Sequence, residues 1–470
     1  MSASFFWYDL ETSGTDPRWD RIVQFAGVRT DEALNEVGER TCTYVKLADD
    51  VLPNPDAALV TGISPSLLAE QGISEWQALG LINQEFSKPD TCAVGYNSLR
   101  FDDEFVRYGL YRTLRDPYAR EWQNGNSRWD ILDLVRAAGA LRREGIEWPV
   151  DEAGLPVYRL EVLTKANGLD HANAHDALSD VHATLGMARL IRDRHQKLFD
   201  YYLAGRFKKQ PKSLLEPYGA QICVHVSGMY PRERFGFATV VSIARHPTNS
   251  NSIIVADLGM DVEMLVNGSE QEIREALFAK NSPNRPPLKE IRVNRCPFVA
   301  PMSVLTDENI SRLNVNLTLI RERQRRLSKP GIAAKIQRVY NRDHPPGHSD
   351  VEAGLYGGFL KDDDRARCVS FTEELKKDQW CDLDYTDKRL HELARRLKAR
   401  DFSHLVTQAE AADHRKFVSD KLHDPDAPWL NFAAFRARLG ELQIEQPNAA
   451  ILNELAEHVE RLEKAYPEAT

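Results

Sequence analysis

The chain has 470 residues, of which 42% are hydrophobic and 28% charged, and its formal net charge is −9. Its mean hydropathy is −0.47, and no apolar run approaches the roughly 18 residues of a membrane span, which argues against a membrane protein. At about 150 residues per domain, the length predicts roughly three domains. The six cysteines show no Cys-x-x-Cys spacing, and the N-terminus lacks a basic stretch followed by an apolar core. We therefore expect a cytoplasmic protein with reduced thiols and no zinc site.

The first predicted element is a buried strand over residues 4–10, because its first half is aromatic. Side chains two positions apart on a strand point to the same face, so Asp9 and Glu11 project together. Two such carboxylates are costly to ionise unless a cation lies between them. Their hard oxygen ligands favour Mg²⁺ or Mn²⁺. The alternative is a strand end that carries two solvated acids before a turn at Gly14.

Alternating and helical patterns follow one another along the next part of the chain. Strands are predicted over 21–30, 41–47 and 91–96, and a helical pattern occupies 64–86. Asp102 and Asp103 come where the last of these strands gives way to another predicted helix. Such junctions often carry the site residues of α/β folds, but acids at a helix start also interact favourably with the helix dipole. The sequence does not separate the two aspartates by chemistry.

Aromatic and cationic side chains alternate over residues 116–143. Cations meet phosphates and rings stack on bases at roughly 1–3 kcal/mol per base, so this composition favours single-stranded nucleic acid. The candidates for substrate contact in and near this stretch are Arg107, Tyr118, Trp122, Arg136 and Arg142. For some of these residues the alternative is an ordinary surface with core aromatics.

A histidine and an acid occur together near residue 180. A loop over 144–156 and a short helix over 159–167 precede them, and apolar residues recur at helical spacing from residue 178 onward. His175 lies five residues before Asp180, which on an ideal helix is about 140° away. We therefore expect His175 to reach in from the first turn or the preceding loop, while Asp180 projects from the helix wall. Taken singly, His175 as a helix cap and Asp180 as an exposed acid are the better interpretations.

The rest of the chain predicts two further parts. After a basic segment at 206–212, strand-like runs over 221–226, 236–243 and 252–258 indicate a β-rich module. A loop-rich stretch with several cations is predicted at 283–301, where it is either a DNA-facing rim or a solvated edge. A basic helix is predicted over 321–329, for which an ordinary solvated face is an equal alternative. Residues 341–352 predict a linker. Helical spacing then recurs over 386–400, 406–422, 432–442 and 449–466.

Considered jointly, the acids and the histidine resemble the DEDDh exonuclease superfamily. Its three motifs resemble Asp9-Leu10-Glu11-Thr12, Asn97-x-x-x-Phe101-Asp102 and His175-x-x-x-x-Asp180. The resemblance implies an α/β, ribonuclease H-like fold with a mixed sheet flanked by helices. The runner-up on motif grounds is an HD-type phosphohydrolase built on His175-Asp176, but it needs further paired histidines, for which His171 alone is poor support.

The whole chain resembles the bacterial exonuclease I family of single-strand DNA exonucleases, because it continues far beyond residue 204, where small members of the superfamily stop. Residues 126–130, 163–168, 225–229 and 355–359 carry the resemblance beyond the catalytic motifs. It implies an exonuclease domain over 1–195, a β-rich SH3-like domain over 196–349 and an α-helical C-terminal domain over 352–470.

The resemblance also implies a mechanism. Asp9, Glu11, Asp102 and Asp180 are expected to hold two Mg²⁺ ions roughly 3.5–4 Å apart, with Mn²⁺ as a substitute. One ion activates water, the other offsets charge on the leaving 3′ oxygen, and His175 takes the proton. The expected products are 5′-mononucleotides released from 3′ to 5′ in DNA repair or recombination. Glu11 and Arg159 are expected to contact the substrate, the alternative for Arg159 being a surface cation at a helix start.

The expected partners are single-stranded DNA and the acidic C-terminal tail of the single-strand DNA-binding protein, and we expect the chain to be a monomer. Extra domains that arch over a groove would retain the strand between cuts, which predicts processive degradation. Two other functions remain open. An RNA-directed DEDDh nuclease is one, since metal ions do not read the 2′ position. A non-catalytic single-strand-binding scaffold is the other, and the complete carboxylate set speaks against it.

Overall fold

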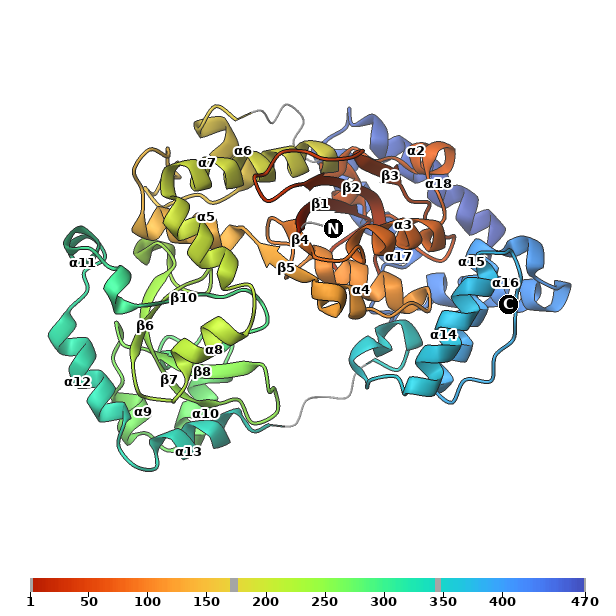
Figure 1. Ribbon diagram of the computed structural model, residues 1–470. Helices are drawn as coiled ribbons and strands as arrows, with labels where there is room; N and C mark the ends of the chain where they lie inside the picture. The colour runs from red at the N-terminus through yellow and green to blue at the C-terminus, as the bar shows by residue number, and fades with distance from the viewer. Residues whose placement is uncertain (1–2, 170–175, 343–347, 469–470) are drawn as a thin grey trace. The chain divides into compact units, whose positions relative to one another are not determined.

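The computed structural model describes residues 3–169, 176–342 and 348–468, and its elements are labelled in Figure 1. The chain forms two compact units. The first comprises Met1–Ser127, Ala172–His182 and Pro346–Thr470, and the second comprises Arg128–His171 and Ala183–Pro345. The long helix α7 (Ala177–Ala204) starts in the first unit and ends in the second. Among the residues described, no helix combines the length and the apolar character needed to cross a membrane.

A mixed sheet forms the centre of the first unit (Figure 1). Strand β1 (Ser4–Thr12) pairs antiparallel with β2 (Ile22–Thr30) and parallel with β4 (Thr91–Gly95). Strand β3 (Thr41–Tyr44) pairs antiparallel with β2, and β5 (Ser127–Asp130) completes the order β3-β2-β1-β4-β5. Alternate residues of β1, Phe6, Tyr8 and Leu10, belong to one buried apolar cluster. This packing explains the aromatic run of the strand.

Helices of the first unit follow the strands closely. They are α1 (Pro55–Thr61), α2 (Pro65–Gln71), α3 (Glu75–Phe86) and α4 (Asp102–Arg112), with the short turns η1 (Ala119–Glu121) and η2 (Gln123–Gly125) after them. The helical pattern over 64–86 is thus two helices. The chain is extended at Gly72, and Ser74 then forms a capping box with Gln77 at the start of α3, which satisfies backbone donors at a new helix start.

The last part of the chain also belongs to the first unit. Its helical elements are η5 (Val351–Tyr356), α14 (Asp362–Leu375), α15 (Lys388–Asp401), η6 (Ser403–Leu405), α16 (Gln408–His423), α17 (Phe432–Glu445) and α18 (Ala450–Ala465). Four of these helices match the predicted ones closely. Helix α14 is not among the predictions, because its buried apolar side chains are few, Cys368, Phe371 and Leu375, in a polar segment.

Two apolar clusters join these C-terminal helices to the N-terminal part of the same unit. Tyr111 of α4 and Leu114, which follows the helix, pack with Phe371 and Leu393. Ala58 of α1 packs in a second cluster with residues of α16, α17 and α18. Burial of this apolar surface stabilises the arrangement at roughly 25 cal/mol per Å², so the C-terminal helices are part of the core of the first unit.

A buried group of charges links the same two parts of the chain. Glu352 of η5 pairs with Arg21 at 2.5 Å and with Arg400 of α15 at 2.6 Å. Asp50 pairs with Arg400 and Lys421, each at 2.6 Å. Burial alone would raise the pKa of both carboxyls, but Arg400 and the other cations hold the pKa of Asp50 and of Glu352 well below the ordinary range. We call Asp50, Glu352, Arg21, Arg396, Arg400 and Lys421 the buried ion cluster.

The second unit contains an antiparallel sheet in the order β10-β6-β7-β8-β9. Its strands are β6 (Ile222–Val226), β7 (Phe237–Arg245), β8 (Ser252–Asp257), β9 (Leu288–Arg292) and β10 (Phe298–Pro301). The three predicted strands of this module are confirmed as β6, β7 and β8. The cation-rich stretch at 283–301 contains β9 and β10, so much of it is sheet rather than a loop.

The other helices of the second unit precede the sheet, connect its strands or follow it in the chain. They are α5 (Leu132–Leu141), α6 (Leu160–Ala166), α8 (Lys209–Leu215), η3 (Arg232–Arg234), α9 (Glu263–Asn267), α10 (Glu270–Phe278), η4 (Met302–Val304), α11 (Asp307–Arg312), α12 (Leu317–Leu327) and α13 (Ile332–Tyr340). Residues of α9, α10, α12 and α13 share one apolar core with β7 and β8. The basic segment at 206–212 leads into α8, and the predicted basic helix lies within α12 and the residues after it.

Candidate active site

Strand β1 presents Asp9 and Glu11 in the sheet of the first unit. Asp9 lies opposite Ala26 of β2, and Glu11 lies opposite Gln24. The register becomes irregular between Glu11 and Thr12, so regular pairing ends directly after the second acid. Since alternate side chains of a strand share one face, the sequence places both carboxylates on the same side of a rigid strand.

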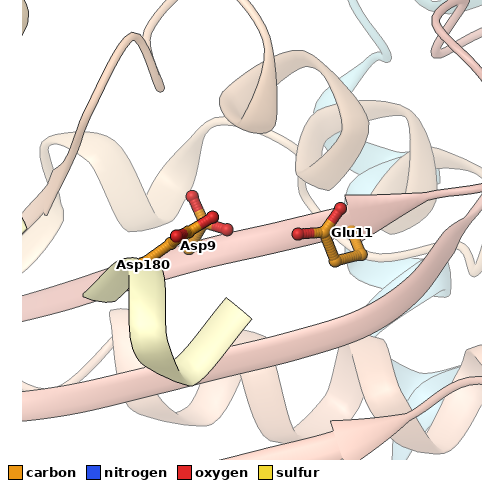
Figure 2. A group of neighbouring side chains, drawn as sticks. All are labelled: Asp9, Glu11 and Asp180. Atoms are coloured by element: carbon orange, nitrogen blue, oxygen red, sulfur yellow. The ribbon is translucent and has the colours of Figure 1, made fainter. Parts of the chain in front are cut away.

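Helix α7 contributes the third carboxylate, Asp180, from its first turn. One oxygen from each of Asp9, Glu11 and Asp180 lies within 4.8 Å of the others, and Figure 2 shows the three side chains gathered between β1 and α7. These acids are separated by about 170 positions in sequence and meet only through the tertiary fold. We call them the carboxylate cluster.

The electrostatics of the carboxylate cluster are unfavourable without a cation. Burial raises the pKa of Asp9 well above the ordinary range, and the charges of Asp102, Asp180 and Glu11 add to the effect. Burial is also the main cause for Glu11, and together with the charges of Asp180 and Asp102 it raises the pKa of Glu11 to about 8. Several carboxylates that share a site cannot all ionise at neutral pH without compensation. An all-oxygen donor set of this kind fits a hard divalent cation.

Asp102 and Asp103 have different environments, which the sequence did not separate. Asp103 is fully buried and accepts hydrogen bonds from Arg120 Nη2 at 2.8 Å and from the Tyr8 hydroxyl at 3.0 Å. Asp102 is also buried, and its charge is the strongest electrostatic influence on Asp9 after burial itself. Asp103 therefore has a structural role, while Asp102 lies in the electrostatic field of the carboxylate cluster.

Gln24 is a residue of this site that sequence reasoning missed. Its side chain is buried, and its Nε2 donates to Asp176 Oδ1 at 3.0 Å while its Oε1 accepts from the backbone N–H of Ala177 at 3.3 Å. Asp176 Oδ2 also accepts from the N–H of Ser179 at 3.2 Å. Gln24 thus ties β2 to the start of α7, the helix that carries Asp180. A polar residue in the apolar first half of β2 is the signal that points to it.

His175, the predicted proton acceptor, lies outside the described residues. The closest described residue on its C-terminal side is Asp176, whose contacts with Gln24 and Ser179 fix the start of α7. The role of His175 stays a prediction.

Three of the predicted substrate contacts belong to the first unit. Arg107 is buried, and its guanidinium pairs with Glu121 at 2.7 Å and with Glu104 at 2.9 Å. Tyr118 packs at the edge of the Phe359 ring. Trp122 is 66% exposed, so it is the member of this group whose ring is free to meet a base.

The other three belong to the second unit. Arg136 pairs with Asp133 at 2.7 Å, and Arg142 donates to the carbonyl of Val304 at 2.9 Å. The side chain of Arg159 is 73% exposed and lies 3.5 Å from Glu161. Arg142 thus has an internal role in the structure, whereas Arg159 is accessible to a phosphate.

Comparison with known families covers almost the whole chain. The sequence matches the family described as Exonuclease over residues 6–187, the Exonuclease I SH3-like domain over 206–342 and the Exonuclease I C-terminal domain over 349–462. Exodeoxyribonuclease I of Haemophilus influenzae is 41% identical over 89% of this chain and 90% of its own length. The Escherichia coli exodeoxyribonuclease I is 40% identical with the same coverage. An oligoribonuclease of Azoarcus sp. is 26% identical over 41% of this chain and 94% of its own.

Solved structures agree with these sequence matches. Exonuclease I of Methylocaldum szegediense superposes with a TM-score of 0.92 at 41% identity, over 98% of this chain and 99% of its own. The Escherichia coli exonuclease I in complex with a dA16 oligonucleotide superposes with a TM-score of 0.93 at 36% identity, over 98% of this chain and 100% of its own. A zinc-bound form of the Escherichia coli enzyme with single-stranded DNA superposes with a TM-score of 0.92 at 35% identity, over 98% of this chain and 100% of its own. A structure of single-strand-binding protein and exonuclease I in complex with an inhibitor superposes with a TM-score of 0.89 at 35% identity. The match covers 98% of this chain and 100% of that chain.

Proposed function

This chain belongs to the exonuclease I family, and from that premise we propose that it removes 5′-mononucleotides from the 3′ end of single-stranded DNA. The observation that carries the proposal is the carboxylate cluster of Asp9, Glu11 and Asp180, which lies within the part of the chain that matches the exonuclease family. The fold agrees with that family: a mixed sheet with helices, an SH3-like module and a helical C-terminal part. We assign these parts the boundaries 1–195, 196–349 and 352–470.

Asp9, Glu11, Asp180 and the neighbouring Asp102 are the residues proposed to hold two divalent cations, Mg²⁺ with Mn²⁺ as a substitute. The raised pKa of Glu11 and of Asp9 supports this role, because a cation would compensate the repulsion among the carboxylates. When bound, such ions polarise a water and offset charge on the leaving oxygen. The all-oxygen composition of the cluster favours hard cations over thiophilic ones.

Each remaining step is assigned to a residue of the chain. His175 accepts a proton from the attacking water, which contributes roughly 10²–10⁴ in rate. Gln24 keeps the first turn of α7 against β2 and so orients Asp180 toward Asp9. Arg159 offers an exposed cation to a phosphate, and Trp122 offers a ring to a base.

Single-stranded DNA is the proposed substrate because the similar Escherichia coli enzyme is solved with a dA16 oligonucleotide. We also propose processive action in DNA repair or recombination by a cytoplasmic monomer, with the acidic tail of the single-strand DNA-binding protein as partner. A complex of that protein with exonuclease I supports the last point. The RNA-directed alternative has weaker support, since the oligoribonuclease match covers 41% of the chain at 26% identity.

The decisive experiment compares end-labelled single-stranded DNA, duplex DNA and RNA, each incubated with the protein and Mg²⁺ with or without a chelator. We expect labelled single-stranded DNA to shorten from its 3′ end, and we expect the chelator to abolish the reaction. Faster digestion of RNA than of DNA would favour the ribonuclease alternative. Equal digestion in chelator would refute the metal-dependent mechanism.

A further inference from the structure

The first unit contains a cavity of about 890 Å³ whose lining residues come from α3, from the segment that follows α4, and from the region of η5, α14 and α15. They do not include the acids of the carboxylate cluster. Its volume lies within the range of roughly 300–1,000 Å³ that holds small organic ligands. The cavity therefore has the size of a ligand site and is separate from the proposed nuclease centre.

Apolar side chains line most of this cavity and continue onto the surface around it. Leu81, Phe359 and Val369 are lining residues, and they are 42%, 81% and 63% exposed. Large apolar groups rarely gather at an exposed rim unless something covers them. The rim thus favours a ligand with an apolar body.

Arg115 is the exception among the lining residues because it is a buried cation. Its guanidinium stacks over the Trp76 ring at 4.6 Å, and its Nη1 lacks a hydrogen-bond partner. Trp76 lines the same cavity, and its Nε1 is also a buried donor without a partner. Burial lowers the pKa of Arg115 to about 10 despite the charges of Asp401 and Glu75. A buried cation with an unpaired donor and no direct carboxylate contact is costly to the folded protein, and an anion bound beside it would offset that cost.

The other charged groups of the cavity wall are already engaged. Lys376 pairs with Glu373 at 2.7 Å, and Arg365 lies 3.3 Å from Asp362. Asp116 accepts hydrogen bonds from the backbone N–H groups of Tyr118 and Ala119. Among the described lining residues, Arg115 is therefore the buried cation whose guanidinium contacts no carboxylate.

We propose that this cavity binds a small amphiphilic organic anion, whose aromatic or aliphatic body fills the apolar space and whose carboxylate, sulfonate or phosphate faces Arg115. Trp76 Nε1 supplies a second donor near the same position. Because the wall comes from both α3 and α14, a bound ligand would also hold the C-terminal helices to the N-terminal part of the unit. The proposal does not rest on the nuclease activity.

Two fluorescent probes test the proposal on the full-length protein in chelator and without DNA. Anilinonaphthalene sulfonate carries aromatic rings and one anionic group, and N-phenyl-1-naphthylamine carries similar rings without the charge. For Arg115→Met we expect the affinity for the sulfonate to fall roughly tenfold or more, because a hydrogen-bonded charge is lost, while the neutral probe binds as before. Arg436→Met removes a cation that does not line the cavity and pairs with Glu463. It is the control, and we expect it to change either affinity less than twofold.

Competition and a second variant complete the experiment. Displacement of the sulfonate by decanoate indicates an acyl ligand, and displacement by 2-naphthoate indicates an aryl ligand. Val369→Trp places a larger side chain at the rim and is expected to weaken the binding of both probes. This variant tests the site independently if Arg115→Met is poorly folded. Unchanged sulfonate affinity in both variants, or no binding by the wild-type protein, would overturn the proposal. Asp9→Asn should retain probe binding while losing nuclease activity, which separates this result from the test of the proposed function.

Discussion

The carboxylate cluster and the buried ion cluster both lie in the first unit, and the surroundings of their acids differ in one respect. In the carboxylate cluster the neighbours of Asp9 and Glu11 are other acids, so their pKa values are raised. In the buried ion cluster Asp50 and Glu352 contact Arg21, Arg400 and Lys421, so their pKa values are lowered. Charges that the fold compensates itself serve stability, whereas charges left uncompensated mark a place for a ligand. The difference separates function from structure among residues of the same type.

The largest expected effect follows from removal of one uncompensated charge. We expect Asp9→Asn to lower the rate of single-strand digestion about 10³-fold, because a metal ion contributes several kcal/mol of transition-state stabilisation. In chelator its melting temperature should equal or exceed that of the wild type, since one repulsive charge is gone. Glu463→Gln, in the exposed pair with Arg436, removes one acid elsewhere and should retain activity. Wild-type rates in Asp9→Asn would contradict the assignment.

The opposite result is expected in the buried ion cluster. Glu352→Gln leaves Arg21 and Arg400 without a full counter-charge, and loss of one partner of a buried pair costs roughly 3–5 kcal/mol. Urea unfolding measures this loss, and Glu463→Gln serves again as the control because exposed pairs contribute about 0–1 kcal/mol. The folded fraction of Glu352→Gln should keep its specific activity. Unfolding free energies equal to that of the wild type would show that the cluster is not a structural link.

Asp401 follows Arg400 of the buried ion cluster, but its pKa is raised like those of the carboxylate cluster. Burial is the main cause and the charge of Glu75 adds to it, so the pKa of Asp401 rises to about 7. The folded protein retains a proton there that the unfolded chain, with an ordinary pKa near 4, releases. The free energy of unfolding should therefore fall as pH rises from about 4 to about 7, by up to about 1.4 kcal/mol per pH unit, and then level off. Asp401→Asn should remove this slope when both proteins are unfolded with saturating Mg²⁺. Parallel pH profiles for the two proteins would refute the shift.

The smallest expected effect concerns the hydrogen bonds around the carboxylate cluster. Gln24→Ala frees the start of α7 and should lower Mg²⁺ affinity or turnover about 10–100-fold, as other outer partners of metal ligands do. A higher Mg²⁺ concentration should recover part of the activity, and a urea unfolding curve in chelator equal to that of the wild type would exclude a folding defect. Gln77→Ala, which removes an exposed capping glutamine, is the matched control. If Gln24→Ala shows wild-type metal affinity and turnover, Gln24 does not position Asp180.

Much of the fold is accessible from the sequence because alternation and helical spacing are local properties. Strands β1, β2 and β4 and four of the C-terminal helices have the predicted type and close to the predicted bounds. The spacing of Asp9 and Glu11 predicts that both lie on one face of a strand, and the resemblance to the DEDDh superfamily implies that Asp180 joins them. The structure brings the oxygens of all three together. Their role as metal ligands remains a prediction.

What the sequence cannot provide depends on contacts between distant residues. Asp102 and Asp103 are adjacent and alike, and only the partners of Asp103, Arg120 and Tyr8, distinguish them. Arg107 has the composition of a phosphate contact, but Glu104 and Glu121 occupy its guanidinium. Glu352 pairs with Arg21, 331 positions away, and no periodicity indicates such a contact.

The attachment of the C-terminal helices to the N-terminal sheet has a consequence for synthesis. The residues that complete the apolar cluster around Ala58 are synthesised long after it, as are the cations that pair with Asp50. A nascent or prematurely terminated chain carries the acids of the carboxylate cluster but lacks this support. We therefore expect a chain that ends before α15 to be less stable than the whole protein, because Ala58 and Asp50 lose these partners.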